Sequence, residues 1–354
     1  MALTAQPGRG AGPRHFAGGD PMDEEEEEVP SLPRARLTVG DVTGPGGLIV
    51  CPGSASLADA AVLLTSTERT AALAIEGLGS TLGLLTENDL LQAFVGGAAR
   101  DCNVAGWLRS ARARLPQCML PALTVGASTT MKEAARQMYL QTGSSNSRHH
   151  LVVEACGSVH GVLSALDIVK VLWLAGLCSS ADGSEGEGTV PEVRGFEDLE
   201  PPAALLAELV GDITVEAAMK PREALPECPW EAPLTQAFAA MAAAGQNCVV
   251  AVGEEEEDGG QGRPHRPVHG VITPRDLLHV LAGDVPVSTA VGSWLLGSQR
   301  GHEPREVAPG AGLVEAAANM ATGRVHHLVV KEPSSRRVAG ILSALDVVCA
   351  IGRV

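Results

Sequence analysis

One ten-residue stretch occurs twice in this chain, and it constrains the fold more than any other feature. Residues 161–170 read GVLSALDIVK, and residues 340–349 read GILSALDVVC. The same pentapeptide, HHLVV, precedes both, at 149–153 and at 326–330. An apolar run that leads into Ser/Thr-x-x-Asp and a helical apolar pattern is typical of a strand that enters a capped helix. The sequence therefore predicts repeated strand-to-helix corners.

Two variants of the corner occur elsewhere, as GLLTEND at 83–89 and as GVITPRD at 270–276. A helical pattern and two apolar runs precede each of the four corners, which predicts four β-α-β-β-α copies in an α/β (α+β) fold. Three pairs of equivalent residues lie 187 positions apart: Thr86 and Thr273, Asp89 and Asp276, Trp107 and Trp294. The repeating unit is therefore a pair of copies, and the chain contains two such modules.

The copies occupy most of the chain. We expect copy 1 at 37–100, copy 2 at 101–178, copy 3 at 212–283 and copy 4 at 284–354. Extended pieces at 37–39 and 213–215 are expected to open copies 1 and 3 as strands. Residues 179–211 are acidic and rich in Gly and Pro, so they are predicted to be the linker between the modules.

Residues 1–36 are predicted to be a disordered acidic tail, because they are rich in Gly, Pro and Ala and contain a run of glutamates at 24–28. The first nineteen residues contain Arg9 and Arg14 and no acid, so an organelle transit peptide is the alternative for this segment. Serine and amphipathic spacing, which such peptides have, are missing.

Charge and cysteine usage exclude several classes of function. The formal net charge of −16 argues against nucleic acid as a partner, because phosphates would not be neutralised. The eight cysteines form no C-x-x-C pair, which favours reduced thiols in an intracellular, cytoplasmic protein. No apolar run approaches the roughly 18–20 residues that span a bilayer, so no membrane partner is expected.

The four copies resemble cystathionine-β-synthase (CBS) domains, and this resemblance covers nearly the whole chain from about Leu37 to Gly352. In that family two copies pair through their sheets as a Bateman module, and the clefts between the copies commonly bind adenine nucleotides. The resemblance thus implies four CBS units in two Bateman modules. We expect each pair to have an approximate twofold axis, with its second helices packed together.

The second copy of each module is also similar to the γ subunit of AMP-activated protein kinase. HHLVV at 326–330 and SALD at 343–346 resemble that subunit's HRLVV strand and SLSD corner. There the histidine and arginine reach ligand phosphates, and the serine and aspartate hold phosphate and ribose. His150 and His327 stand where that subunit has arginine.

The corner residues have chemistry that suits a nucleotide. A carboxylate can accept hydrogen bonds from both hydroxyls of a ribose, and a helix N-terminus favours a phosphate beside it. The candidate ligand-binding residues are Asp89, Asp167, Asp276 and Asp346, with Thr86, Ser164, Thr273 and Ser343 at the N-caps. The alternative is structural, because Ser/Thr-x-x-acid is also a capping box. The corner at Asp89 is the weakest candidate, since Glu87 would repel a phosphate.

Four histidines form the second group of candidates: His149, His150, His326 and His327. Adjacent strand residues face opposite ways, so only one histidine of each pair is expected to face a ligand. No cysteine or carboxylate lies at a spacing that predicts a metal site. Phosphate contact and plain sheet packing both remain open. Trp107 and Trp294 are predicted to pack in the core.

No nucleophile elbow, Walker loop or paired catalytic carboxylates occur, so we expect a non-catalytic regulatory protein. It would sense AMP, ADP or ATP, without a covalent cofactor, and signal to a protein partner. The kinase-like version is a γ-like subunit bound to kinase subunits. The alternative is a scaffold or self-associating protein that binds no nucleotide and whose corners are only caps.

Overall fold

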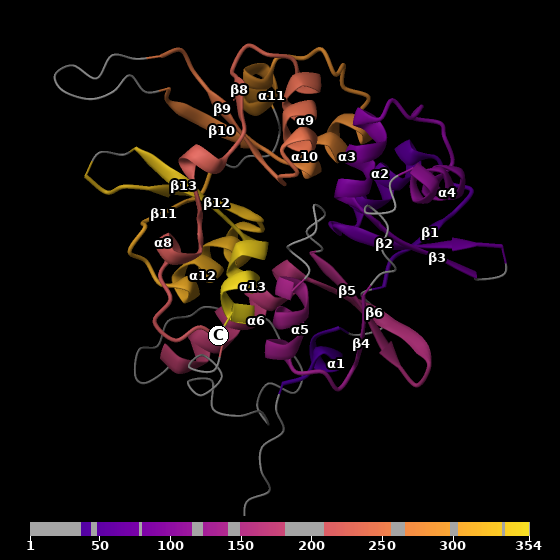
Figure 1. Ribbon diagram of the computed structural model, residues 1–354, viewed down its shortest axis with the longest axis horizontal. Helices are drawn as coiled ribbons and strands as arrows, with labels where there is room; N and C mark the ends of the chain where they lie inside the picture. Colours follow the sequence, from indigo (N-terminus) through magenta and orange to yellow (C-terminus); the bar gives the residue numbers. More distant parts are fainter. Residues whose placement is uncertain are drawn as a thin grey trace, which may run out of the picture. The chain divides into compact units, whose positions relative to one another are not determined.

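The computed structural model describes nine segments, which contain all four predicted copies (Figure 1). They are residues 37–43, 48–77, 80–114, 123–140, 149–180, 209–255, 266–297, 304–334 and 337–353. The predicted tail at 1–36 lies outside the described residues, and so do 181–208 of the predicted linker.

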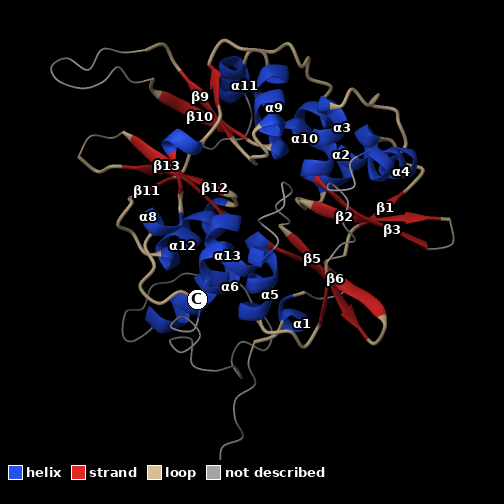
Figure 2. Ribbon diagram, in the orientation of Figure 1, coloured by secondary structure: helices blue, strands red, loops and turns tan. Residues whose placement is uncertain are grey.

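Each copy contains one small mixed sheet, in which the first strand runs parallel to the second and the third runs antiparallel to it (Figure 2). Copy 1 has β1 (Val50–Pro52), β2 (Ala71–Glu76) and β3 (Ser80–Thr86). Copy 2 has β4 (Thr124–Gly126), β5 (His150–Ala155) and β6 (Ser158–Ser164). Copy 3 has β8 (Glu227–Pro229), β9 (Val249–Val252) and β10 (Val268–Ile272). Copy 4 has β11 (Glu306–Val307), β12 (His327–Lys331) and β13 (Val338–Ser343).

Two main helices accompany each sheet, one before the central strand and one directly after the last strand. In chain order the pairs are α2 (Leu57–Ser66) and α3 (Glu87–Val95), α5 (Met131–Leu140) and α6 (Ala165–Ser180), α9 (Leu234–Ala243) and α10 (Pro274–Ala282), and α12 (Leu313–Gly323) and α13 (Ala344–Arg353). Two further helices, α4 (Val104–Arg114) and α11 (Val291–Gly297), follow copies 1 and 3. The predicted α/β fold of four β-α-β-β-α copies is confirmed.

The segments that open the two modules belong to the second copy of each module, so the strands expected at 37–39 and 213–215 are wrong. Val39–Val42 is a short helix, α1, and Thr38 forms a β-bridge with Thr130 of copy 2. Helix α8 (Val215–Ala218) likewise follows a bridge from Thr214 to Gly312 of copy 4. After it, β7 (Lys220–Pro221) adds a fourth strand to the copy 4 sheet, and a 3₁₀ turn at Arg222–Ala224 follows. The physical reason is burial, since Val39 and Val215 are fully buried in the core of copies 2 and 4.

The two copies of the second module pack through their sheets, as the Bateman pairing requires. A separate apolar cluster joins one sheet face of copy 3 to one of copy 4: Leu225, Cys248, Val250, Val252, Val329 and Ile341. In the first module the register equivalents of Val250 and Val329 are Leu73 and Val152, and both are buried.

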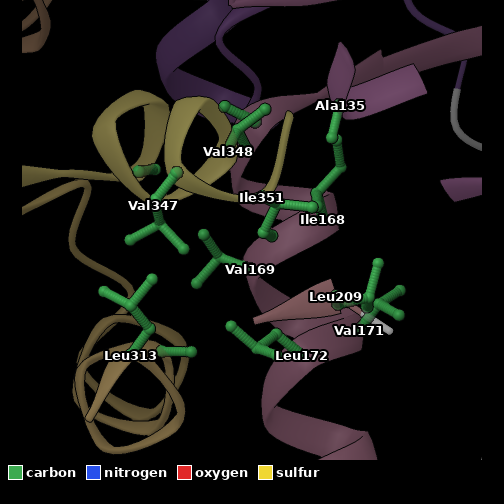
Figure 3. Packing of buried hydrophobic residues seen from close by; sticks show 14 of the residues in the cluster. Ala135, Ile168, Val169, Val171, Leu172, Leu209, Leu313, Val347, Val348 and Ile351 are labelled. Atoms are coloured by element: carbon green, nitrogen blue, oxygen red, sulfur yellow. The ribbon is translucent and has the colours of Figure 1, made fainter. Parts of the chain in front are cut away.

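Helices pack between modules, which corrects the expectation that the two second helices of one module pack together. Helix α13 of copy 4 contacts α5 and α6 of copy 2, and α6 also contacts α12. In Figure 3, Ile168 of α6 and Ile351 of α13 point into one cluster of buried side chains. Full burial of such a side chain stabilises the fold by about 1.5–3 kcal/mol. The second helices therefore meet across the module boundary.

Copies 1 and 3 meet in the same way. Helix α10 contacts α2 and α3, and α3 contacts α9. Phe94 and Phe238 stack edge to face, with ring centroids 5.7 Å apart. Trp107 and Trp294 pack against this core, which confirms the prediction for both. No helix in the described segments is long and apolar enough to cross a membrane.

Candidate ligand site at the strand-to-helix corners

All four corners use one oxygen of the aspartate to cap a helix. In copy 4, the backbone N–H and the hydroxyl of Ser343 donate to Asp346 Oδ2, at 2.8 and 2.6 Å. The N–H of Asp346 donates back to Ser343 Oγ at 3.2 Å. The equivalent pairs Thr86–Asp89, Ser164–Asp167 and Thr273–Asp276 make the same two bonds to Oδ2. Capping is thus shown at every corner, and a ligand would have to bind the second oxygen, Oδ1.

In copy 3 the second oxygen is also bonded within the protein. Trp294 Nε1 donates to Asp276 Oδ1 at 2.7 Å, and Asp276 is fully buried. A ribose hydroxyl could reach this carboxylate only after the Trp294 bond breaks. At the copy 3 corner, both oxygens of Asp276 therefore accept hydrogen bonds that stabilise the fold.

In copies 2 and 4 the second oxygen lies near a lysine. Lys170 Nζ is 3.9 Å from Asp167 Oδ1, and Lys220 Nζ is 3.9 Å from Asp346 Oδ1. These two carboxylates keep 18% and 11% of their side-chain surface exposed, in contrast to Asp276. Each therefore presents a partly accessible oxygen with a cation beside it.

The corner of copy 1 is paired with copy 3. Arg275 forms an ion pair with Glu87 at 3.0 Å and donates to the carbonyl of Arg69 at 3.1 Å. The negative charge of Glu87, expected to repel a phosphate, is therefore neutralised by an arginine of the other module. Sequence reasoning missed this pair because the two residues lie far apart in the chain.

The four histidines begin the central strands of copies 2 and 4, directly beside the corners. His150 pairs with Ser164 across β5 and β6, and His327 pairs with Ser343 across β12 and β13. The carbonyls of His149 and His326 accept the N–H of the first residue of α6 and α13, at 2.8 and 2.9 Å. Each histidine pair is thereby fixed to its own Ser-Ala-Leu-Asp corner.

Neighbouring copies supply partners for two of these rings. Thr70 Oγ1 of copy 1 lies 2.6 Å from His150 Nε2, and Asn247 of copy 3 donates to His149 Nε2. Thr70 and Asn247 occupy the strand position that His149 and His326 have in the other copies. We call His149, His150, His326, His327, Thr70 and Asn247 the histidine hub. His326 and His327 lie close enough to His149 for their charges to lower its pKa, so the hub contains residues from all four copies.

Three of the hub histidines, His149, His150 and His326, are held in the neutral form. Burial lowers the pKa of His150 to about 4. Burial, with Arg275 as the next cause, lowers the pKa of His326 to about 4. The pKa of His149 is also lowered well below its usual value of 6.5 by burial. At neutral pH these rings can therefore form hydrogen bonds, but they carry no positive charge.

Burial raises the pKa of Asp346, and the charge of Lys220 partly offsets this effect. Sequence reasoning did not select Lys170, Lys220 or Arg275, which are the cations around the hub. The available signal for Lys170 was its position three residues after Asp167, one helical turn away. No group of three or more metal-binding side chains occurs in the described segments.

Comparisons with known proteins agree with this architecture. Residues 117–174 match the CBS domain family. A search of curated proteins found no match. The fold is similar to protein MJ1225 from Methanocaldococcus jannaschii, a proposed archaeal homologue of γ-AMPK, with a TM-score of 0.58 and 12% identity over 88% of this chain and 99% of that one.

A second structure, an uncharacterised conserved protein from Pyrococcus horikoshii, has a TM-score of 0.47 and 14% identity over 89% of this chain and 100% of its own. A CBS domain protein from Pyrobaculum aerophilum, PAE2072, was solved in complex with AMP and matches 38% of this chain and 89% of its own, with 19% identity and a TM-score of 0.29. Residues 117–174 of this chain therefore match a CBS domain, and the fold of the chain, with four copies paired into two modules, is similar to that of MJ1225.

Proposed function

We propose that this chain is a non-catalytic regulatory protein that binds an adenine nucleotide, AMP, ADP or ATP, at the corners of copies 2 and 4. Asp167 and Asp346 would each accept ribose hydroxyls through Oδ1. The phosphate would extend toward the histidine hub. Ser164 and Ser343 would hold each aspartate in place by the cap, and the corners at Asp89 and Asp276 would serve structure first.

One observation carries this proposal. The corners at Asp167 and Asp346 each combine a partly exposed carboxylate, a lysine near its second oxygen and a histidine pair. A cap needs only one oxygen and no cation, so capping alone does not account for this combination. Ribose, phosphate and hydrogen-bonding rings do account for it. CBS proteins solved with AMP, such as PAE2072, are consistent with this choice of ligand.

Regulation would follow from the packing of the modules. Hydrogen bonds join His150 to copy 1 and His149 to copy 3, and the charges of His326 and His327 of copy 4 act on His149, so a ligand there would change contacts between the modules as well as within them. A ligand that binds one packing more tightly shifts the population toward it. A protein partner would recognise the changed packing. In the most specific form of this proposal, the chain is a γ-like subunit of a kinase.

A scaffold function is the second candidate, and the four capping boxes favour it. Every corner aspartate is used as a cap, and Asp276 has both oxygens bonded within the protein. In that case the apolar clusters between the copies serve only to assemble the molecule. Its partner would then be another protein chain or a second copy of this chain, and not a kinase subunit.

The two functions differ in their response to Asp167→Asn and Asp346→Asn. In each variant the remaining side-chain oxygen can keep the cap, while the amide NH₂ replaces the ribose-facing oxygen. We expect each change to weaken AMP binding at its own corner about tenfold or more in titration calorimetry, because charge-assisted bonds are roughly twice as strong as neutral ones.

The matched control is Asp59→Asn. Asp59 forms the same capping box with Ser56 at the start of α2, away from the hub. It should leave nucleotide affinity unchanged and alter only the free energy of unfolding, by well under about 1 kcal/mol. If Asp167→Asn and Asp346→Asn bind AMP as the parent does, the ribose assignment is wrong and the scaffold function remains.

A further inference from the structure

Lys220 lies beside the copy 4 corner, with Nζ 3.9 Å from Asp346 Oδ1, although it comes from the segment that precedes copy 3. We propose that Lys220 is the phosphate-binding cation of this corner and makes it prefer a nucleoside monophosphate to the nucleoside. This inference rests on the proposed function, because it assumes that ribose binds Asp346. It adds the group that recognises the rest of the ligand.

The backbone places Lys220 firmly against the corner. Strand β7 pairs antiparallel with β13, with Lys220 opposite Ile341 and Pro221 opposite Gly340. A Cβ at position 340 would lie 2.2 Å from the carbonyl oxygen of Lys220, so only glycine allows the two strands to approach this closely. The side chain of Lys220 therefore starts from a strand that is held in the copy 4 sheet.

One hydrogen bond orients the ammonium group of Lys220, and its other N–H donors can bind a phosphate. Lys220 Nζ donates to Gln246 Oε1 at 2.8 Å and lies 3.9 Å from Asp346 Oδ1. The second distance is an ion pair and too long for a hydrogen bond. A lysine ammonium has three donors, and one is used by Gln246. The side chain keeps 31% of its surface exposed, so an added phosphate oxygen can reach it.

A bound phosphate needs a positive charge beside it, and the neutral histidines His149 and His326 do not supply one. Lys220 donates to Gln246, whose chain neighbour Asn247 contacts His149, so the ammonium lies near both Asp346 and the hub. His149 and His326 are neutral at pH 7, for the reasons given above. A phosphate beside Asp346 would otherwise meet only a like charge and neutral rings.

The other two cations near the hub are committed elsewhere. Arg275 is paired with Glu87 of copy 1, and Lys170 lies beside the carboxylate of copy 2. Among the described residues around Asp346, Lys220 is the cation within ion-pair distance.

The test compares AMP with adenosine, which differ only by the phosphate. Titration calorimetry would be done in an Asp167→Asn background, so that copy 4 provides the remaining site. Lys220→Met keeps the length of the side chain and removes its charge. We expect it to weaken AMP binding about tenfold or more and to leave adenosine affinity within about twofold. Lys220→Arg should restore most of the preference for AMP.

Lys331→Met is the matched control, since it removes one lysine charge from β12 at a site paired with Glu306 and with a similar exposure of 29%. It should leave both affinities unchanged. If Lys220→Met keeps the preference of its background for AMP over adenosine, the role of Lys220 is wrong and the proposed function stands. If the parent protein binds neither compound, the proposed function itself fails.

Discussion

Single side chains in this protein combine structural and binding roles, and the two oxygens of Asp346 show how. Oδ2 caps α13 through the N–H and hydroxyl of Ser343, while Oδ1 lies beside Lys220. Sequence reasoning treated capping and ribose binding as alternatives at each corner. The geometry makes them compatible, because a carboxylate has about four acceptor positions and the cap uses only some of them.

The cap should have a measurable value of its own. Ser343→Ala removes the hydroxyl that donates to Asp346 Oδ2 and accepts its N–H. We expect the free energy of unfolding to fall by about 1 kcal/mol, measured by urea denaturation without ligand. An unchanged midpoint would mean that the serine does not act as the helix cap.

The hub histidines predict a pH dependence of stability. His150 and His326 have a pKa of about 4 in the folded chain, against 6.5 as the ordinary value. The unfolded chain therefore binds more protons between these values. Their contribution to stability is fully present above about pH 6.5 and is lost as the pH falls toward 4, on the order of 3 kcal/mol for each.

Denaturation midpoints between pH 7.5 and 4.5 would measure this loss. The raised pKa of Asp346 acts in the opposite direction, because its protonated form is favoured in the folded chain. His326→Gln keeps a hydrogen-bonding side chain without a titrating group, so it should flatten the slope between pH 6.5 and 4.5. A slope equal to that of the parent would show that His326 is not held neutral by the fold.

Sequence could predict the four histidines of the hub but not their partners. The HHLVV pentapeptides identified the histidines, because they repeat at 149–153 and 326–330. Thr70, Asn247 and Lys220 belong to other copies and carry no comparable pattern. Their contacts depend on how the copies pack, which local spacing does not encode.

At the scale of elements, the central strands and main helices follow the hydrophobic pattern closely. The strand-to-helix corners expected at 83–89, 161–170, 270–276 and 340–349 are found where β3, β6, β10 and β13 lead into α3, α6, α10 and α13. The strands β1, β4, β8 and β11 were missed, since two or three residues are too few to show a period. The segments at 37–39 and 213–215 look extended, but their buried valines belong to the second copies.

Close helix contact between modules needs glycine at one position. A Cβ at Gly352 of α13 would lie 2.8 Å from the carbonyl oxygen of Ala135 in α5. Gly352→Val should separate the two helices and cost about 1–3 kcal/mol, as overpacking does. Urea denaturation would measure this cost. A variant as stable as the parent would mean that α5 and α13 are not in close contact.

At the scale of the whole molecule, the helix contacts join the modules. Copies 1 and 3 share one apolar core, and copies 2 and 4 share the other, so neither module buries its helices alone. We therefore expect residues from both modules to unfold together. Phe238→Ala removes a fully buried ring that stacks on Phe94 of the other module and should cost about 3–5 kcal/mol.

Differential scanning calorimetry would show this coupling. A single transition in the parent, moved as a whole by Phe238→Ala, is the expected result. Two separate transitions, of which only one responds to Phe238→Ala, would contradict the shared cores.

The central claim is that this chain binds an adenine nucleotide, and a thermal melt tests it most directly. The parent protein would be melted alone and with AMP, ADP, ATP or GTP at about 100-fold saturation. Binding to the folded state should add roughly 2–3 kcal/mol and raise the Tm with at least one adenine nucleotide, with a smaller shift for GTP. No shift with any adenine nucleotide, or an equal shift with GTP, would contradict the account.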